Sequence, residues 1–138
     1  MKAFIFFGIL LLIIGCKEVT EQQNPIVESY PMKEVMAVHD ELMPKMGTIV
    51  QLQQKLKDTA IVGHKQAYED LKTANDAMML WMENLADDFE TDELLSRKQL
   101  SEEKLQVLDT YTESVEALKV QMETAILNAQ RISKDTIK

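Results

Sequence analysis

Three segments of this chain place apolar residues every three or four positions, and this spacing limits the fold to long amphipathic helices. The pattern is unbroken in residues 101–133, where Ser101, Glu102 and Glu103 supply a hydroxyl cap and acidic residues for a helix start. Alternating steps of three and four put residues on one helix face, as in a coiled coil. This face holds Leu108, Tyr111, Val115, Leu118, Met122, Ala125, Ala129 and Ile132.

Residues 32–57 form the first of the three segments, and their apolar face is broader. Met36, Met43 and Val50 flank the seam, which is typical of a helix in a bundle. Pro44 falls inside the pattern but off the seam, so we expect it to bend the helix on its outer side. The seam consists of Met32, Val35, His39, Leu42, Met46, Ile49, Gln53 and Leu56.

Residues 60–89 form the second segment, and residues 57–63 are the expected turn before it. Gly63 can fall inside the first helical turn, and His64 beside it is expected to be exposed to solvent. The short connection predicts that the first two helices are antiparallel neighbours. The expected seam is Tyr68, Leu71, Asn75, Met78, Met82, Leu85 and Phe89, with Ala67, Ala74 and Trp81 as a flanking column.

The acidic residues 87–100 are less periodic, and we expect a linker with one helical turn around residues 93–97. Glycine and proline are scarce, with 4 and 3 residues, whereas helix-forming residues are plentiful. The sequence therefore predicts an all-α fold: an elongated, antiparallel, coiled-coil-like three-helix bundle that forms one domain over residues 32–134.

The N-terminus has the pattern of a bacterial lipoprotein signal peptide. Met1 and Lys2 precede an uncharged apolar stretch of 13 residues, too short for the roughly 20 residues of a membrane-spanning helix. The stretch ends in Ile13-Ile14-Gly15-Cys16, which resembles a lipobox. This resemblance implies that residues 1–15 are cleaved, that Cys16 carries the lipid anchor, and that residues 16–31 are a flexible tether to the bundle.

The predicted location is the cell envelope. Lys17 and Glu18 follow the cysteine, and the absence of aspartate at the next position favours the outer membrane, on its periplasmic or its surface face. Cleavage leaves 14 basic and 23 acidic residues, which argues against nucleic acid as a partner. The expected associations are the membrane, through the lipid, and another envelope protein; a homo-oligomer stays open.

Two further stretches extend the resemblance to most of the mature chain. Residues 39–47 read HDELMPKMG and residues 74–82 read ANDAMMLWM. Together with the lipobox they resemble small Bacteroidota lipoproteins that are often labelled "viral A-type inclusion protein". That label reflects general coiled-coil similarity, so the resemblance implies no viral role, no activity and no site residues.

One cluster could carry chemistry. Nine methionines are many for 138 residues, and several share helix faces with one histidine and the single tryptophan. Thioether sulfur and imidazole are suitable ligands for Cu(I), so copper or small-ligand binding is the alternative function. Methionine also fills gaps between packed helices, which is the preferred interpretation, with Asn75 as a hydrogen-bond partner of His39. The candidate residues are Met36, His39, Met43, Met46, Met78, Met82 and Trp81.

No catalytic pattern accompanies this cluster. Residues 39–43 lack the second histidine of a zincin helix, and the sequence contains neither a glycine-rich phosphate loop nor a Gly-x-Ser-x-Gly elbow. The sequence thus predicts a lipid-anchored protein whose helical bundle binds or scaffolds without enzymatic activity and without a cofactor, copper being the alternative. A hydrophobic groove and a pH-sensitive His39 are further alternatives.

Overall fold

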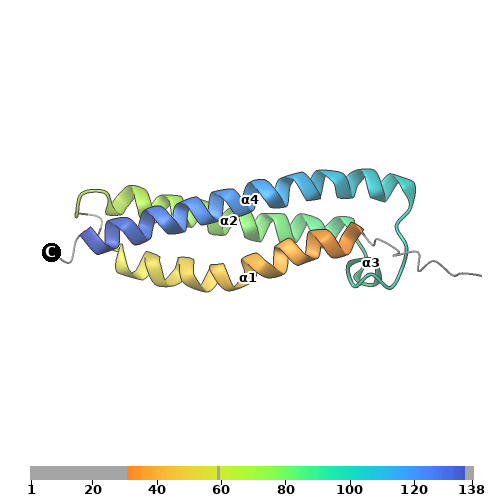
Figure 1. Cartoon of the computed structure of the whole chain (residues 1–138), viewed down its shortest axis with the longest axis horizontal. Helices are drawn as coiled ribbons and strands as arrows, with labels where there is room; N and C mark the ends of the chain where they lie inside the picture. Colours follow the sequence, from red (N-terminus) through yellow and green to blue (C-terminus); the bar gives the residue numbers. More distant parts are fainter. Residues whose placement is uncertain (1–30, 59, 136–138) are drawn as a thin grey trace, which may run out of the picture.

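The computed structural model describes residues 31–58 and 60–135 and contains four helices (Figure 1). They are α1 (Pro31–Lys55), α2 (His64–Asp88), α3 (Thr91–Leu94) and α4 (Glu102–Asp135). The described residues contain no strand, so the all-helical prediction is confirmed. Cys16, the predicted signal peptide and the tether up to residue 30 lie outside the described residues.

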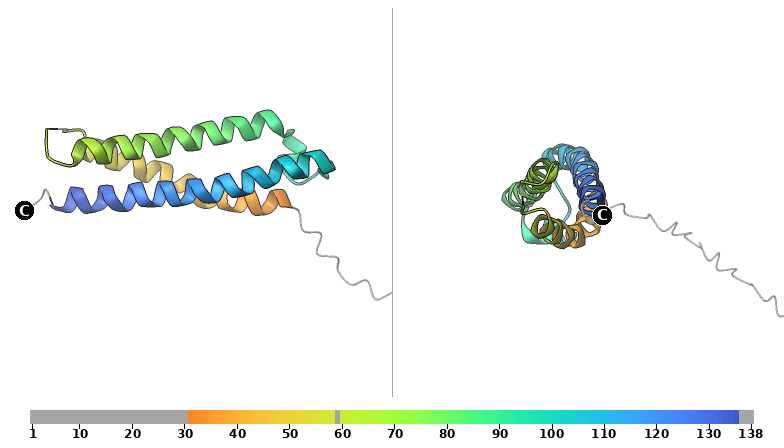
Figure 2. Two further views of the ribbon diagram at one scale, coloured as in Figure 1. Left: turned by 90° about the horizontal axis from the view of Figure 1, so that it is seen from above. Right: turned by 90° about the vertical axis from the view of Figure 1, so that its left-hand side faces the viewer.

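The three long helices lie side by side and alternate in direction (Figure 1). Viewed end-on, they surround a common axis, and α4 packs against both α1 and α2 (Figure 2). At 1.5 Å per residue, α4 is about 50 Å long and spans the whole bundle. We call the end that holds Pro31 and α3 the α3 end. The opposite end, with residues 56–58 and 60–63 and the C-terminus of α4, is the loop end.

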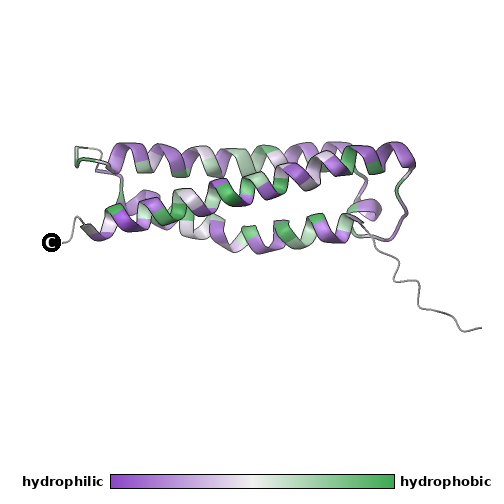
Figure 3. Cartoon of the chain, turned by 45° about the horizontal axis from the view of Figure 1, so that its top comes forward, coloured by the Kyte–Doolittle hydropathy of each residue, from purple (hydrophilic) through white to green (hydrophobic). Residues whose placement is uncertain are grey.

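The core follows the predicted seams of α1 and α4 closely. Green and purple alternate along each ribbon in Figure 3, as expected for helices with one apolar face. A fully buried aliphatic side chain contributes about 1.5–3 kcal/mol relative to an exposed one, so a continuous seam is the main stabilising element. Residues of α1 and α4 that are at most 1 % exposed are Val35, Leu42, Ile49, Leu108, Val115, Met122 and Ala129.

The apolar face of α1 is narrower than predicted. Met43 and Val50 are 41 % and 48 % exposed, and His39 and Met46 are only partly buried. His39 contacts Trp81 of α2, and α1 packs less extensively with α2 than with α4. Pro44 lies inside the helix and is exposed, in agreement with its predicted position away from the seam.

The seam of α2 is rotated by one position from the prediction. Ala67, Ala74 and Trp81 are buried, whereas Tyr68, Asn75 and Met82 are only partly buried. Both rows are spaced by sevens and share Leu71, Met78 and Leu85. Since alanine allows α4 to approach closely, the row with the small residues faces the core. The same rotation buries His64, which is 3 % exposed, so its predicted solvent exposure was wrong.

α2 begins at His64, four residues later than predicted, because Gly63 is not helical. Its φ of 84° is in the left-handed region, which favours glycine. A Cβ atom there would lie 3.6 Å from the Ile132 side chain of α4. Gly63 therefore ends the turn instead of joining the first helical turn.

The same substitution should have opposite effects at the two glycines of the bundle. Gly63→Ala should lower the free energy of unfolding by about 1–2 kcal/mol, the cost of a left-handed residue with a Cβ. Gly47 is an exposed residue within α1, and a Cβ there would meet no atom within 4 Å. Gly47→Ala should therefore raise the free energy of unfolding by about 0.5–1 kcal/mol. Urea denaturation measures both values; a loss at Gly47 would contradict its open surroundings.

The linker contains α3, which lies at Thr91–Leu94 and not around residues 93–97 as predicted. Glu90 and Glu93 form a reciprocal capping box for this short helix. The Glu93 carboxylate is 3 % exposed and accepts hydrogen bonds from Lys104 Nζ and from the backbone N–H of Glu90. The contact with Lys104 is the largest cause that lowers the pKa of Glu93, and it ties the linker to the start of α4.

Candidate functional site

An aromatic row crosses the bundle from α1 through α2 to α4. The His39 ring stacks on Trp81 with centroids 6.0 Å apart, and Trp81 meets the edge of Tyr111 at 5.7 Å. The Trp81 Nε1–H donates to Ser114 Oγ at 3.0 Å, and the Tyr111 hydroxyl donates to Asp88 Oδ2 at 2.6 Å. Each polar tip of the two buried aromatic residues therefore has a partner, as stable burial requires.

Burial raises the pKa of Tyr111 to about 12, and the hydrogen bond to Asp88 adds to this rise. The phenol is therefore neutral near pH 7 and acts as a hydrogen-bond donor that joins α4 to the end of α2. The row braces three helices, because its rings and their hydrogen-bond partners come from α1, α2 and α4.

The structure brings together part of the predicted methionine and histidine cluster. His39 and Trp81 are in contact, and Met36, Met46 and Met82 pack against the edge of the core. Met78 is fully buried in the core, while Met43 is 41 % exposed on the surface. The predicted residues therefore occupy three environments: core, core edge and surface.

His39 has a different partner from the one predicted. Its Nδ1 lies 2.9 Å from Asp40 Oδ1, and its ring rests on Trp81, where Asn75 was the expected hydrogen-bond partner. Within residues 31–58 and 60–135, no group of three or more His, Cys, Asp or Glu residues could hold a metal ion. That finding does not concern thioether ligands, so copper binding by this set stays a prediction.

A ladder of ion pairs joins α1 to α4 beside this cluster. Lys119 Nζ lies 2.6 Å from Glu41 Oε2, and Lys45 bridges Glu41 and Glu123 at 3.2 and 2.5 Å. The contacts with Lys119 and Lys45 lower the pKa of Glu41. Because these side chains are partly exposed to solvent, we expect each pair to contribute little to the stability of the fold.

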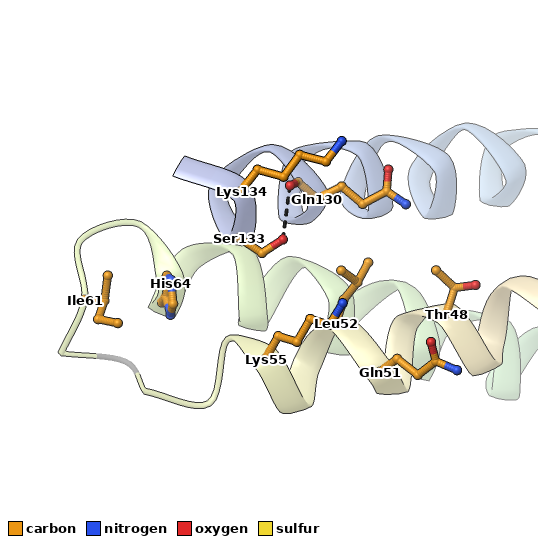
Figure 4. Close-up of a pocket in the computed structure, with 9 residues that line it drawn as sticks. All are labelled: Thr48, Gln51, Leu52, Lys55, Ile61, His64, Gln130, Ser133 and Lys134. Atoms are coloured by element: carbon orange, nitrogen blue, oxygen red, sulfur yellow. Dashed lines mark hydrogen bonds between the residues drawn. The ribbon is translucent and has the colours of Figure 1, made fainter. Parts of the chain in front are cut away.

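A pocket at the loop end was not predicted from the sequence. Residues of α1, α2 and α4, together with Ile61 of the turn before α2, line it (Figure 4). Its volume is about 710 Å³, within the range of small-ligand pockets. His64 and Ile61 lie at its outer end, between Lys55 of α1 on one side and Ser133 and Lys134 of α4 on the other (Figure 4). The lining residues are Thr48, Gln51, Leu52, Lys55, Ile61, His64, Gln130, Ser133 and Lys134.

The charge of this pocket differs from that of the bundle as a whole. Its ionisable residues are two lysines and one histidine, with no carboxylate. Three other grooves along the bundle each include an acidic side chain: Asp88, Asp70 and Glu123. The loop-end pocket is therefore a cationic site on a chain whose formal net charge is −8.

Searches against protein families, curated proteins and solved structures give no match to this chain. None of the helices within residues 31–58 and 60–135 combines the length and apolar character needed to cross a membrane.

Proposed function

We propose that the chain is a lipid-anchored protein of the cell envelope, held in the outer membrane by Cys16 after cleavage of residues 1–15. Its three long helices act as a coiled-coil-like bundle that binds or scaffolds another envelope component without catalysing a reaction. The observation that carries this proposal is the lengthwise polarity of the bundle. The α3 end follows the proposed lipid anchor along the chain and is acidic, whereas the loop end carries more basic than acidic residues.

The order of the chain supports the α3 end as the end nearer the membrane. α1 begins at Pro31, and fourteen residues separate it from Cys16. Fully extended, fourteen residues reach at most about 50 Å, so the α3 end stays within that distance of the anchor. The loop end lies a further bundle length away, because α1 runs from the α3 end to the loop end.

The charge distribution supports the same orientation. The half of the bundle at the α3 end, residues 31–43 and 77–118, has fourteen acidic and four basic residues. The half at the loop end, residues 44–76 and 119–135, has six acidic and eight basic residues. Anionic lipid repels the acidic half within a Debye length of about 8 Å, so the bundle should stand away from the membrane and present its loop end.

A photo-crosslinker at the loop end tests the binding part of the proposal. Val62 is 96 % exposed in the turn between α1 and α2, and a crosslinking residue there should not disturb the core. We expect irradiation of intact cells to give one adduct of defined mass with another envelope protein. Leu95, 52 % exposed near α3, is the matched control position and should give none.

Two results would count against this orientation. A lack of adducts from Val62 would contradict presentation of the loop end to a partner. Stronger adducts from Leu95 would place the partner at the acidic end instead.

A further inference from the structure

We infer that the loop-end pocket binds a phosphate group, as inorganic phosphate or as the phosphate of a small ester such as a lipid headgroup. The site lies within the bundle, so this inference is independent of the lipid anchor. It rests on three observations about the pocket: its two lysines have no ion-pair partner among the described residues, the charges of the helix ends leave it positive, and neutral hydrogen-bond donors line it.

At least five of the ten lysines in the described residues form ion pairs with carboxylates, and the two lysines of the pocket are not among them. Lys45, Lys72, Lys98, Lys104 and Lys119 each contact a carboxylate within ion-pair distance. In the part of the chain that the structure describes, Lys55 and Lys134 have no carboxylate within that distance, and both line the same pocket. Their positive charges are therefore available to a bound anion.

The helix ends offset only part of this charge. The C-termini of α1 and α4 meet the N-terminus of α2 at this pocket, and each helix end carries about half a unit charge. The three ends together contribute about −0.5, against two full positive charges from Lys55 and Lys134. The pocket therefore stays positive, although neutralisation of the two C-termini is one role of these lysines.

Gly63, the residue before α2, has no side chain to cap the helix, and no side-chain hydrogen bond caps its N-terminus. Backbone amides at the start of a helix bind anions well, particularly together with lysine. Here the helix start is one wall of a pocket that already contains two cations. The amides of the helix start therefore add to the attraction of an anion, while the two lysines are the main source of positive charge in the pocket.

Neutral donors favour phosphate over a simple carboxylate. The side chains of Gln51, Gln130 and Thr48 line the same space and can donate to an anion. The Ser133 hydroxyl already donates to the backbone carbonyl of Gln130 at 3.1 Å (Figure 4). Two cations and several neutral donors match an anion with three or four oxygens better than one with two. A long polyanion would be repelled by the acidic remainder of the bundle.

A titration of the isotope-labelled full chain in neutral detergent tests the inference. Inorganic phosphate is added at constant ionic strength, and backbone amide shifts are followed by NMR. We expect saturable shifts at residues 61–66, while the indole resonance of Trp81, in the half of the bundle at the α3 end, stays unchanged. Acetate serves as the matched probe for a carboxylate and should shift the same amides less at equal concentration.

Charge-neutralising variants supply the decisive comparison. The double variant Lys55→Gln, Lys134→Gln should bind phosphate at least about tenfold more weakly, since hydrogen bonds to charged groups contribute more than neutral ones. Lys72→Gln removes the charge of a lysine that is paired with Asp76 and distant from the pocket, so its affinity should change less than about twofold. Equal losses in both variants, or shifts that never saturate, would overturn the inference.

Glycerol phosphate, added in parallel, distinguishes the two sources of the ligand. Tighter binding than inorganic phosphate would assign the pocket to a phosphate ester such as a lipid headgroup. Equal or weaker binding would assign it to free phosphate. Failure of both probes would overturn the phosphate site and leave the proposed anchoring and scaffolding untouched, because those are tested by crosslinking and by lipid labelling.

Discussion

Leu71→Ala should lower the free energy of unfolding by about 3–5 kcal/mol, as buried leucine-to-alanine changes do when the cavity cannot collapse. Leu71 is fully buried in the first half of α2, within one turn of Ala67 and Ala74. Its neighbours Ala67 and Ala74 are too small to fill the space. A domain of this size has a stability of roughly 5–15 kcal/mol, so this loss should be plain in urea denaturation followed by circular dichroism.

Leu80→Ala provides the matched control on the same helix. Leu80 is 56 % exposed, so the same truncation there should change the free energy of unfolding by no more than about 0.5 kcal/mol. Similar losses at both positions would contradict the orientation of α2. A loss at Leu80 alone would mean that α2 turns a different face to the core.

The long helices could be predicted because their periodic segments extend over many turns, whereas the face of α2 could not. Its two candidate rows, Ala67–Ala74–Trp81 and Tyr68–Asn75–Met82, differ by one position and share the same leucines and methionine. The choice depends on contacts outside the segment: the stacking of His39 on Trp81 and the edge contact of Tyr111 with Trp81. The burial of His64 follows from the same choice of face, so it could not be predicted from the α2 segment alone either.

The loop-end pocket could not be predicted because its residues come from three separate segments. In the sequence, Lys134 is a basic residue near a helix C-terminus, a position where lysine is common and indicates no site. That it lines the same pocket as Lys55 is a property of the antiparallel packing. Glu93 illustrates the same limit, since an acidic linker predicts solvated carboxylates, yet Lys104 and a backbone amide bury this one.

Cys16→Ser should abolish incorporation of labelled palmitate and shift the chain from the membrane fraction to the soluble fraction. Each buried methylene of an acyl chain contributes about 0.8 kcal/mol, so several chains on one cysteine hold a protein firmly. The chain has one cysteine, so the labelled thiol is unambiguous. The acidic half of the bundle favours release once the lipid is lost, because anionic lipid repels it.

A relocated thiol separates recognition of the lipobox from mere reactivity of cysteine. Ser29→Cys in the Cys16→Ser background restores one thiol to the chain thirteen residues beyond Cys16. There Glu28 stands in place of the glycine that precedes Cys16, and no long uncharged apolar stretch leads up to it. This double variant should stay unlabelled, because the modifying enzymes read the residues before the cysteine. Label in the double variant would mean that any accessible thiol is acylated. An unlabelled wild type would remove the anchor, and with it the argument that the loop end is the end presented away from the membrane.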